Sequence, residues 1–398
     1  MDEDFLLLNP GPVPVSDAVL ASMTEPMVSH RSAAFEAVYE RAQDGLAHVF
    51  TRSSLNGART AAPDGGETLI FNGTATMAME AAVANLVAGV GRASDAEVVA
   101  LVNGKFGRRF ARIAERYADC TRVEVEWGES IPLDAVAEAV TDDTDVVTMV
   151  HNETSTGLLN PVSGVGRIAR DHDAAFVVDG VTSIGGDAFH VDDWNVDVAI
   201  TDAQKALAAP PGTSAMYATS RAIERFDGER APFYEDLDWH VRKAGDHQTP
   251  FTSAVPLFRA LATAVEEIRE EGLPARIARH RRQAAAVREG MTAMGLDLFA
   301  EPRGATVRSN TLTAVSLPDP VRGDAAADFF DAVAERNVSV AGGQAHLGGE
   351  IFRLSNMGNL TADQVLRGVR TVGEAMRDAG VGVDAEAGVE AARRRLDA

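Results

Sequence analysis

The chain is poor in cysteine and in long apolar runs. Cys120 is the only cysteine in 398 residues, which excludes an internal disulfide and any cysteine-rich metal site, and we expect no metal. No stretch of about 18 residues is apolar and free of charge, so the sequence predicts no membrane-spanning helix. The first residues are acidic and lack the basic region that begins a secretion signal, so we expect a cytoplasmic protein.

Positive charge, and lysine above all, is also scarce. The net charge is −22, which argues against nucleic acid or an anionic membrane as a partner. Three of the 37 basic residues are lysines, namely Lys105, Lys205 and Lys243. A dense acidic surface with almost no lysine is typical of adaptation to high salt, and a GC-rich genome that favours arginine codons is the alternative explanation. In both cases the charge concerns solubility and not chemistry.

What the chain does contain is an alternation of short apolar runs and helical patterns. The apolar runs lie at 68–71, 97–103, 145–151, 175–180 and 197–201. Continuous apolar strands that alternate with helices predict an α/β fold, with a mostly parallel central sheet covered by helices. Two longer helical patterns follow, at about 254–271 and 274–294, and the last third predicts a smaller α+β domain.

We therefore expect an N-terminal segment, a large domain, connecting helices, a small C-terminal domain and a tail that is helical or frayed. Their expected bounds are 1–20, 21–255, 256–295, 296–380 and 381–398. Residues 52–66 are expected to form a surface loop, because they are rich in polar residues, glycine and proline. The sequence contains no internal repeat.

Lys205 follows the apolar run 197–201, so it is expected in a loop at the carboxyl end of a strand. Open α/β sheets bind ligands there, and a lysine in such a cleft can lose its proton and attack a carbonyl. Asp179 closes the apolar run "AFVVD" and needs a cationic or donor partner, such as a pyridinium nitrogen. The alternatives are a surface lysine for Lys205 and a helix cap or structural ion pair for Asp179.

Three further features come with alternatives of their own. In "NGTATMAMEAA" the backbone amides of Gly73, Thr74 and Ala75 are expected at a helix start, where they would bind an anion or simply begin a threonine-capped helix. Phe106 in "VNGKFG" can stack on a planar ring or pack in the core. Arg353 in "IFRLSN" either clamps a carboxylate or extends its charge to solvent.

With these residues the chain resembles the class V aminotransferases, which are fold-type I pyridoxal-phosphate enzymes, and in particular the alanine/serine–glyoxylate (serine–pyruvate) group. The resemblance covers roughly residues 5–380. It rests on the order and spacing of several motifs. They are "LLLNPGPVPV", "NGTATMAMEAAVANL", "NGKFGRRFARIAERY", "HNETSTGLLNPV", "VVDGVTSIGG", "TDAQKALAAPPG", "QTPFTSAVPLFRAL" and "EIFRLSNMGN".

The resemblance implies transamination between a small amino acid and a 2-oxo acid, with pyridoxal 5'-phosphate bound by the large domain. Lys205 resembles the lysine that forms the Schiff base and moves the proton, which explains why arginine cannot replace it. Asp179 resembles the partner of the pyridinium nitrogen, and Arg353 the clamp for the substrate's α-carboxylate. The remaining residues that the resemblance places around the cofactor are Gly73, Thr74, Ala75, Phe106, Thr154 and Gln204. Thr249 resembles a threonine that reaches the phosphate in the partner subunit, which implies a homodimer with shared sites.

Some positions differ from the alanine/serine–glyoxylate aminotransferases, so a second possible substrate, phosphoserine, has to be considered. Asp246 stands where that group often carries tyrosine, and His346 where a proline is common. The motif "SHR" with His30 and Arg31 resembles phosphoserine aminotransferases, in which these residues bind the substrate phosphate. His30, Arg31 and His346 are therefore expected to form a pocket for a phosphate or second carboxylate, if phosphoserine is the donor.

Three other functions are less compatible with the sequence. A cysteine desulfurase needs a reactive cysteine well after the lysine, whereas Cys120 precedes Lys205. A nicotinamide dehydrogenase needs a glycine-rich fingerprint after a strand, and "GVGRAS" at 89–94 follows a helical pattern. A non-enzymatic protein that binds pyridoxal phosphate would not need Lys205, Asp179 and Arg353 together.

Overall fold

The computed structural model describes residues 5–62, 65–90 and 95–398, so part of the "GVGRAS" motif lies outside the described residues. The central sheet of the described chain has the strand order β2–β10–β9–β8–β5–β3–β4. These strands are β2 (Gly66–Asn72), β3 (Glu97–Val102), β4 (Asp119–Glu124), β5 (Thr144–Val150), β8 (Ala175–Asp179), β9 (Val198–Asp202) and β10 (Thr213–Thr219). Only β10 runs antiparallel to its neighbours, so the predicted α/β fold with a mostly parallel sheet is confirmed.

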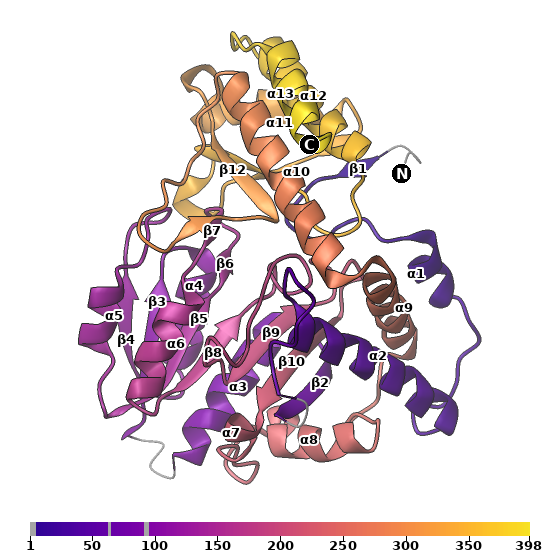
Figure 1. Ribbon diagram of the computed structural model, residues 1–398, viewed down its shortest axis with the longest axis vertical. Coiled ribbons are helices and arrows are strands. Elements are labelled where there is room, and N and C mark those ends of the chain that lie inside the picture. The colour runs from indigo at the N-terminus through magenta and orange to yellow at the C-terminus, as the bar shows by residue number, and fades with distance from the viewer. Residues whose placement is uncertain (1–4, 63–64, 91–94) are drawn as a thin grey trace.

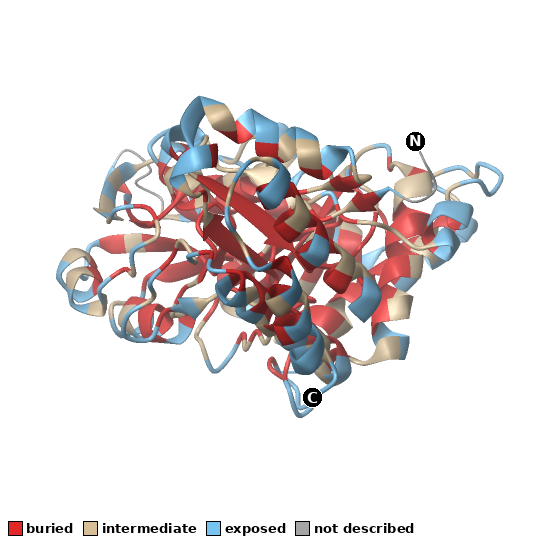
Figure 2. Cartoon of the chain, turned by 90° about the horizontal axis from the view of Figure 1, so that it is seen from above, coloured by how far each residue is buried: buried red, intermediate tan, exposed pale blue. Residues whose placement is uncertain are grey.

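Helices cover both faces of this sheet, as Figure 1 shows. They include α2 (Ala33–Arg52), α3 (Ala75–Gly89), α4 (Lys105–Ala114), α5 (Leu133–Ala139), α6 (Val162–Asp171), α7 (Ser220–Ile223) and α8 (Leu237–Gly245). The strands lie in the interior of the molecule, and the exposed positions concentrate on the outer faces of the helices (Figure 2). Because the middle strands are buried on both faces, their sequences are almost continuously apolar.

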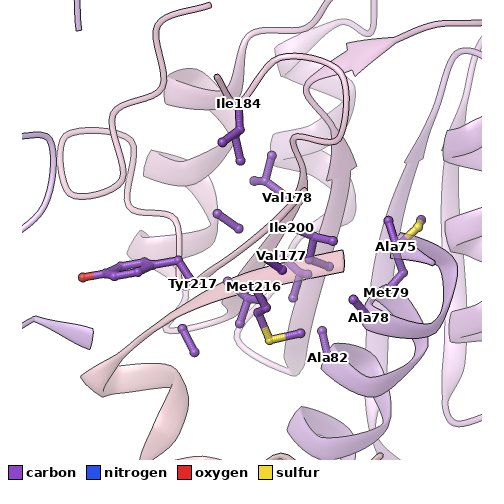
Figure 3. Close-up of a cluster of buried hydrophobic side chains, with 14 of the residues drawn as sticks. Ala75, Ala78, Met79, Ala82, Val177, Val178, Ile184, Ile200, Met216 and Tyr217 are labelled. Atoms are coloured by element: carbon purple, nitrogen blue, oxygen red, sulfur yellow. The ribbon is translucent and has the colours of Figure 1, made fainter. Parts of the chain in front are cut away.

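Helix α3 packs against the sheet through small side chains. Ala75, Ala78 and Ala82 are buried on this helix, and Met79 lies beside them (Figure 3). Alanine has a short side chain and high helix propensity, so the helix can approach the strands closely without losing stability. This close packing fixes the start of α3 against the carboxyl ends of β8 and β9.

The predicted connecting helices are α9 (Val255–Glu271) and α10 (Leu273–Ala293), which lead from the large domain to the small domain. Gly272 separates them with a φ of 80°, a conformation that glycine adopts without strain. At the far end, α13 (Ala385–Leu396) is a helix whose buried alanines pack against α10. The tail is therefore an ordered part of the small domain.

The small domain contains the sheet β12–β15–β14, formed by Leu312–Ser316, Ile351–Ser355 and Ala341–Gly342. It is covered by α11 (Ala326–Ala334), α12 (Ala362–Asp378) and α13. The N-terminal strand β1 (Leu6–Leu7) pairs with β13 (Val338–Ser339) of the same domain. The N-terminal segment therefore starts beside the small domain and then crosses toward the large one, as the indigo trace that leaves β1 indicates (Figure 1).

Candidate active site

The carboxyl ends of β8 and β9 bring two buried aspartates to one edge of the sheet. Asp179 is the last residue of β8 and Asp202 the last of β9, and the two strands are parallel neighbours. Lys205 lies in the turn after β9, where its amide donates to the Asp202 carbonyl. Open α/β sheets place ligand sites at this edge, so the fold itself brings Lys205 and Asp179 to one site.

The Lys205 amine is enclosed by the N-terminal segment. Its Nζ donates to the Pro10 carbonyl at 2.6 Å, and a Cβ on Gly11 would collide with the Lys205 side chain. Burial lowers the pKa of Lys205, although the carboxylates of Asp202 and Asp179 oppose this shift. A larger fraction of the amine is therefore neutral, and the neutral amine is the nucleophilic form.

Asp179 has one carboxylate oxygen that could accept from a cationic partner. Its Oδ1 accepts a hydrogen bond from the Val181 amide at 2.9 Å, and in the described chain no donor contacts Oδ2. Burial raises the pKa of Asp179 to about 7, and the nearby carboxyl groups of Glu153 and Asp202 add to the rise. A protonated ring nitrogen at Oδ2 would favour the ionised carboxylate, because opposite charges stabilise each other strongly in a buried site.

The start of α3 carries the amides expected to bind an anion. Two of them are already occupied, since Gly73 donates to the Gly212 carbonyl and Ala75 donates to Asp202 Oδ2. Thr74 occupies the N-cap position, and its hydroxyl makes no capping hydrogen bond. Gln204 donates its side-chain amide to Asp202 at 2.8 Å. The anion site expected here therefore depends on the amide and hydroxyl of Thr74, with the helix dipole behind them.

Phe106 lies at the start of α4, and a buried carboxylate holds that helix end. Glu153 Oε2 accepts from the amides of Phe106 and Gly107, each at 3.0 Å, and Oε1 accepts from Ser155. The half-buried Phe106 ring lies under the Arg109 guanidinium, whose carbon is 4.9 Å from the ring centroid. Arg109 also donates to the Thr76 hydroxyl on α3 at 2.8 Å, so one arginine links the first turns of both helices.

Arg353 is a buried guanidinium on β15 of the small domain. Its Nε and Nη2 donate to the Gly342 carbonyl at 3.1 and 2.8 Å, and Nη1 donates to the Thr154 carbonyl at 2.9 Å. Among the described residues no carboxylate lies within ion-pair distance of it. Burial lowers the pKa of Arg353 to about 10, although Glu153 opposes the shift. The arginine therefore joins the two domains beside Thr154 and keeps a net positive charge available for an acidic ligand.

Thr249 and Arg31 lie together in one chain. Arg31 Nη1 donates to Gln248 Oε1 and the Thr249 carbonyl, and Nη2 donates to the carbonyls of Pro250 and Phe251. The Thr249 hydroxyl donates to the Phe251 carbonyl at 2.7 Å, so a contact with a phosphate would require this hydroxyl to turn away. Within one chain Arg31 therefore holds the loop that carries Thr249.

The residues expected to form a phosphate pocket are not brought together within one chain. The His346 ring lies 4.5 Å from the Trp127 ring, and no described hydrogen bond joins His346 to His30 or Arg31. His30 is half-buried just before α2. Within one chain Arg31 contacts the 248–251 loop, whereas His346 contacts Trp127.

Comparison with known proteins agrees with this arrangement. Residues 5–360 match the family model "Aminotransferase class-V". The chain belongs to the class V aminotransferase family. It is 36% identical over 398 residues to an uncharacterised aminotransferase of Methanocaldococcus jannaschii, covering 98% of this chain and 97% of the relative. It is 31% identical to the L-aspartate–glyoxylate aminotransferase of Paracoccus denitrificans, covering 96% of this chain and 94% of the relative. It is 30% identical to the serine–glyoxylate aminotransferase of Arabidopsis thaliana, covering 98% of this chain and 94% of the relative.

Solved structures show the same fold-type I architecture. The pyridoxamine–pyruvate aminotransferase from Mesorhizobium loti superposes with a TM-score of 0.88 at 28% identity, covering 98% of this chain and 97% of that chain. This aminotransferase is therefore an enzyme whose cofactor is pyridoxal 5'-phosphate. Its residues fit that group, because three features lie around one sheet edge: an amine whose pKa is lowered by burial, a buried carboxyl group without an ion-pair partner among the described residues, and a helix start without a side-chain cap.

Sequence reasoning missed three residues of this aminotransferase's site. Asp202 ends the apolar run of β9 as Asp179 ends that of β8, so the same pattern could have identified it. Glu153 stands in the quoted motif "HNETSTG", but nothing in the sequence shows that its carboxylate holds the start of α4. Arg109 acts across two helices, and helical periodicity does not predict such a contact.

Proposed function

We propose that this aminotransferase moves the amino group of a small L-amino acid, serine or alanine, to glyoxylate or pyruvate. The observation that carries the proposal is Arg353, a buried guanidinium without an acidic partner in the described chain, at the boundary between the two domains. A buried unpaired charge costs free energy, and a bound carboxylate would offset that cost. The names of the relatives, which include serine, glyoxylate and pyruvate, support the substrate class.

Arg353 binds and orients the α-carboxylate. Its Nη1 and Nη2 are held by two carbonyls, Thr154 on the large domain and Gly342 on the small domain. Because the guanidinium is planar and fixed at two points, it presents its remaining N–H groups in one direction, which suits bidentate binding of a carboxylate. Every amino or 2-oxo acid carries this group, so Arg353 serves both half-reactions.

Lys205 handles the proton. Pyridoxal phosphate, when bound, supplies an aldehyde that condenses with amines and a ring that accepts electrons. The lowered pKa of Lys205 lets Nζ accept a proton from the α-carbon of the substrate and return it at the neighbouring position. Asp179 Oδ2 would accept from the protonated ring nitrogen of the cofactor, and its negative charge would keep that nitrogen protonated. The segment around Pro10 and Gly11 covers Nζ and limits access of water.

The working unit under this proposal is a homodimer in the cytoplasm. Phe233 and Tyr234 expose 75% and 47% of their surface just outside the loop of Thr249, and Tyr234 stacks on Phe251 at 4.4 Å. Exposed aromatic clusters of this kind are typical of protein interfaces. A second copy that covers this cluster would place the loop of Thr249 at the edge of its partner's cofactor site.

Two alternatives have less support. Phosphoserine as donor needs His30, Arg31 and His346 around one phosphate, whereas Arg31 is engaged by four acceptors of the 248–251 loop. A desulfurase needs a reactive thiolate, but burial raises the pKa of Cys120 to about 11. Cys120 also lies on β4, the edge strand of the sheet farthest from β10 and β2.

The test is a panel of donors and acceptors, measured at low and high salt. Serine, alanine, aspartate, phosphoserine and pyridoxamine serve as donors against glyoxylate, pyruvate and 2-oxoglutarate. We expect the highest kcat/KM for serine or alanine with glyoxylate or pyruvate. Arg353→Gln should lower kcat/KM for all amino acids by about 100-fold or more, whereas Arg370→Gln, an exposed control, should not. A preference for phosphoserine, or equal rates in Arg353→Gln, would overturn the proposal.

A further inference from the structure

Helix α4 carries a concentration of positive charge, of which the transamination site described above uses only Arg109. A hollow of about 550 Å³ lies along this helix and is closed on other sides by Trp127 and Ala345. The charged residues that line it are Lys105, Arg108, Arg109, Arg112, Arg116 and Glu115. The single acid is already paired, since Glu115 bonds to Arg122 at 2.6 Å. The hollow therefore has a strong net positive charge in a chain whose net charge is −22.

These cations are mostly free. Arg108 pairs with Glu124, and Arg109 bonds to a neutral hydroxyl on Thr76. For Lys105, Arg112 and Arg116, no acidic partner lies within ion-pair distance in the described part of the chain. Two further acids lie near α4, but Glu153 accepts from the amides of Phe106 and Gly107 and Glu124 pairs with Arg108, so neither pairs with Lys105, Arg112 or Arg116.

The arrangement is unfavourable for the helix by itself. Lys105 is its first residue, at the positive end of the helix dipole. Lys105 and Arg109, and also Arg108 and Arg112, are like charges four residues apart and repel each other along one side of the helix. The Glu153 carboxylate already accepts from two amides at this helix start, so a bound anion would mainly relieve the repulsion between the side chains. Residues that oppose local stability in this way mark functional sites more often than scaffold positions.

The walls of the hollow suit a small organic molecule. Trp127 supplies an aromatic wall, with the Arg108 guanidinium carbon 5.0 Å from its ring centroid and the His346 ring on it at 4.5 Å. The volume lies in the range of pockets for small ligands. Arginine forks bind carboxylates and phosphates through paired hydrogen bonds, and several such groups are needed to match this number of cations.

We infer that the α4 hollow is a binding site for a small organic polyanion with two or more carboxylate or phosphate groups. Arg112 and Arg116 provide exposed cations at its outer side, and Lys105 and Arg109 provide half-buried cations near Phe106. The same chemistry can belong to a second acidic group on a reactant or to a separate ligand that binds beside the active site. The inference does not depend on which amino acid is the donor.

Calorimetry on the holoenzyme tests this site, with the cofactor fixed to the protein by borohydride so that its phosphate site is filled. The probes are citrate and pyrophosphate, with acetate as a singly charged control, at several NaCl concentrations. We expect one citrate or pyrophosphate per chain, with an affinity that falls as salt rises. Binding of acetate or chloride as tight as that of the polyanions would mean an adventitious ion only and would overturn the inference.

Variants assign the binding to the hollow. Arg112→Gln with Arg116→Gln should weaken citrate binding at least tenfold, and Lys105→Gln alone should weaken it in the same direction. The matched control is Arg282→Gln with Arg377→Gln, two exposed helical arginines outside the hollow, which should bind citrate as the unmodified protein does. Arg353→Gln should also bind it. Binding that is lost in Arg353→Gln but retained in the α4 variants would place the anion in the substrate site and overturn the inference.

Steady-state kinetics then separate the two sources of the anion. If citrate raises the apparent KM of the amino donor and leaves kcat unchanged, the hollow receives an acidic group of a reactant. If citrate changes kcat at constant KM, the ligand is separate. Either result supports the site. Unaltered citrate binding in all α4 variants would refute it, whatever the preferred amino donor is.

Discussion

Two regions of the aminotransferase differ in how far the chain itself buries their side chains. The strand-end cluster, formed by Glu153, Asp179, Asp202 and Lys205, is buried and sits on rigid strands and tight turns. The aromatic segment, residues 232–254, exposes Phe233 and Tyr234 to solvent, although Leu237, His240 and Thr249 within it are buried. The cluster brings the chemical groups together within one chain, whereas the two exposed aromatic side chains have no covering surface in the described chain. Under the proposed homodimer, a second copy would cover them.

Removal of the amine should have the largest effect. Lys205→Ala should abolish covalent attachment of the cofactor and lower turnover by about 10,000-fold or more, because Lys205 is the lysine that follows β9 beside Asp179 and Asp202. Mass spectrometry after borohydride reduction measures the attachment. Lys243→Ala is the control, since Lys243 is partly exposed on α8 and pairs with Asp246 at 3.0 Å. Normal turnover in Lys205→Ala would show that the strand-end cluster is not the catalytic site.

Asp179→Asn should separate catalysis from stability. Turnover should fall by about 100-fold or more, because a neutral amide does not keep the ring nitrogen protonated. The Val181 hydrogen bond to Oδ1 can remain, so the fold should persist.

The same substitution should stabilise the cofactor-free protein at pH 8. The folded pKa of Asp179 is raised from 3.8 to about 7. Between these values the folded state holds a proton that the unfolded state has released, so stability falls as pH rises and the loss is complete above pH 7. Asn avoids this loss, which is on the order of 4 kcal/mol. Denaturant unfolding should show a higher free energy of unfolding for Asp179→Asn at pH 8 and little difference at pH 4.

The control is Asp197→Asn, which breaks a buried pair with Arg221 and should lower the free energy of unfolding at pH 8. An equal loss in Asp179→Asn would contradict the predicted gain.

Substitutions in the aromatic segment should change self-association and leave the stability of each chain unchanged. Phe233→Ser combined with Tyr234→Ser should weaken self-association by about 10- to 100-fold, because two large apolar side chains no longer become buried. Each chain should keep its fold. Sedimentation velocity and cofactor retention measure the result, and Leu55→Ser is the control, an exposed leucine on another loop. If the double variant sediments as the unmodified protein does, the segment is not the interface.

The sequence predicts these two regions unequally for physical reasons. Buried parallel strands are continuous apolar runs, so β5, β8 and β9 and the residues at their ends, Asp179 and Lys205, can be located directly. The apolar runs do not include β4 and β10, because their sequences, DCTRVE and TSAMYAT, mix polar and small residues with apolar ones. Contacts that close loops over long distances, such as Arg31 with residues 248–251, leave no periodic pattern. The motif "SHR" therefore suggested a substrate ligand where one chain shows a support for a loop.

Arg31→Gln should give the smallest effect and decide between these two roles. The guanidinium bonds to four acceptors of the 248–251 loop. Its loss should loosen that loop and weaken cofactor retention by about tenfold, as expected for lost hydrogen bonds to a charged group at a partly exposed position. Since the loop serves every substrate, kcat/KM for serine and phosphoserine should fall together and their ratio should stay constant. Arg242→Gln, an exposed arginine paired with Asp238 on α8, should change neither. A selective loss of phosphoserine turnover would instead show that Arg31 reaches a substrate phosphate, and in that case the partner subunit must complete the pocket with His346.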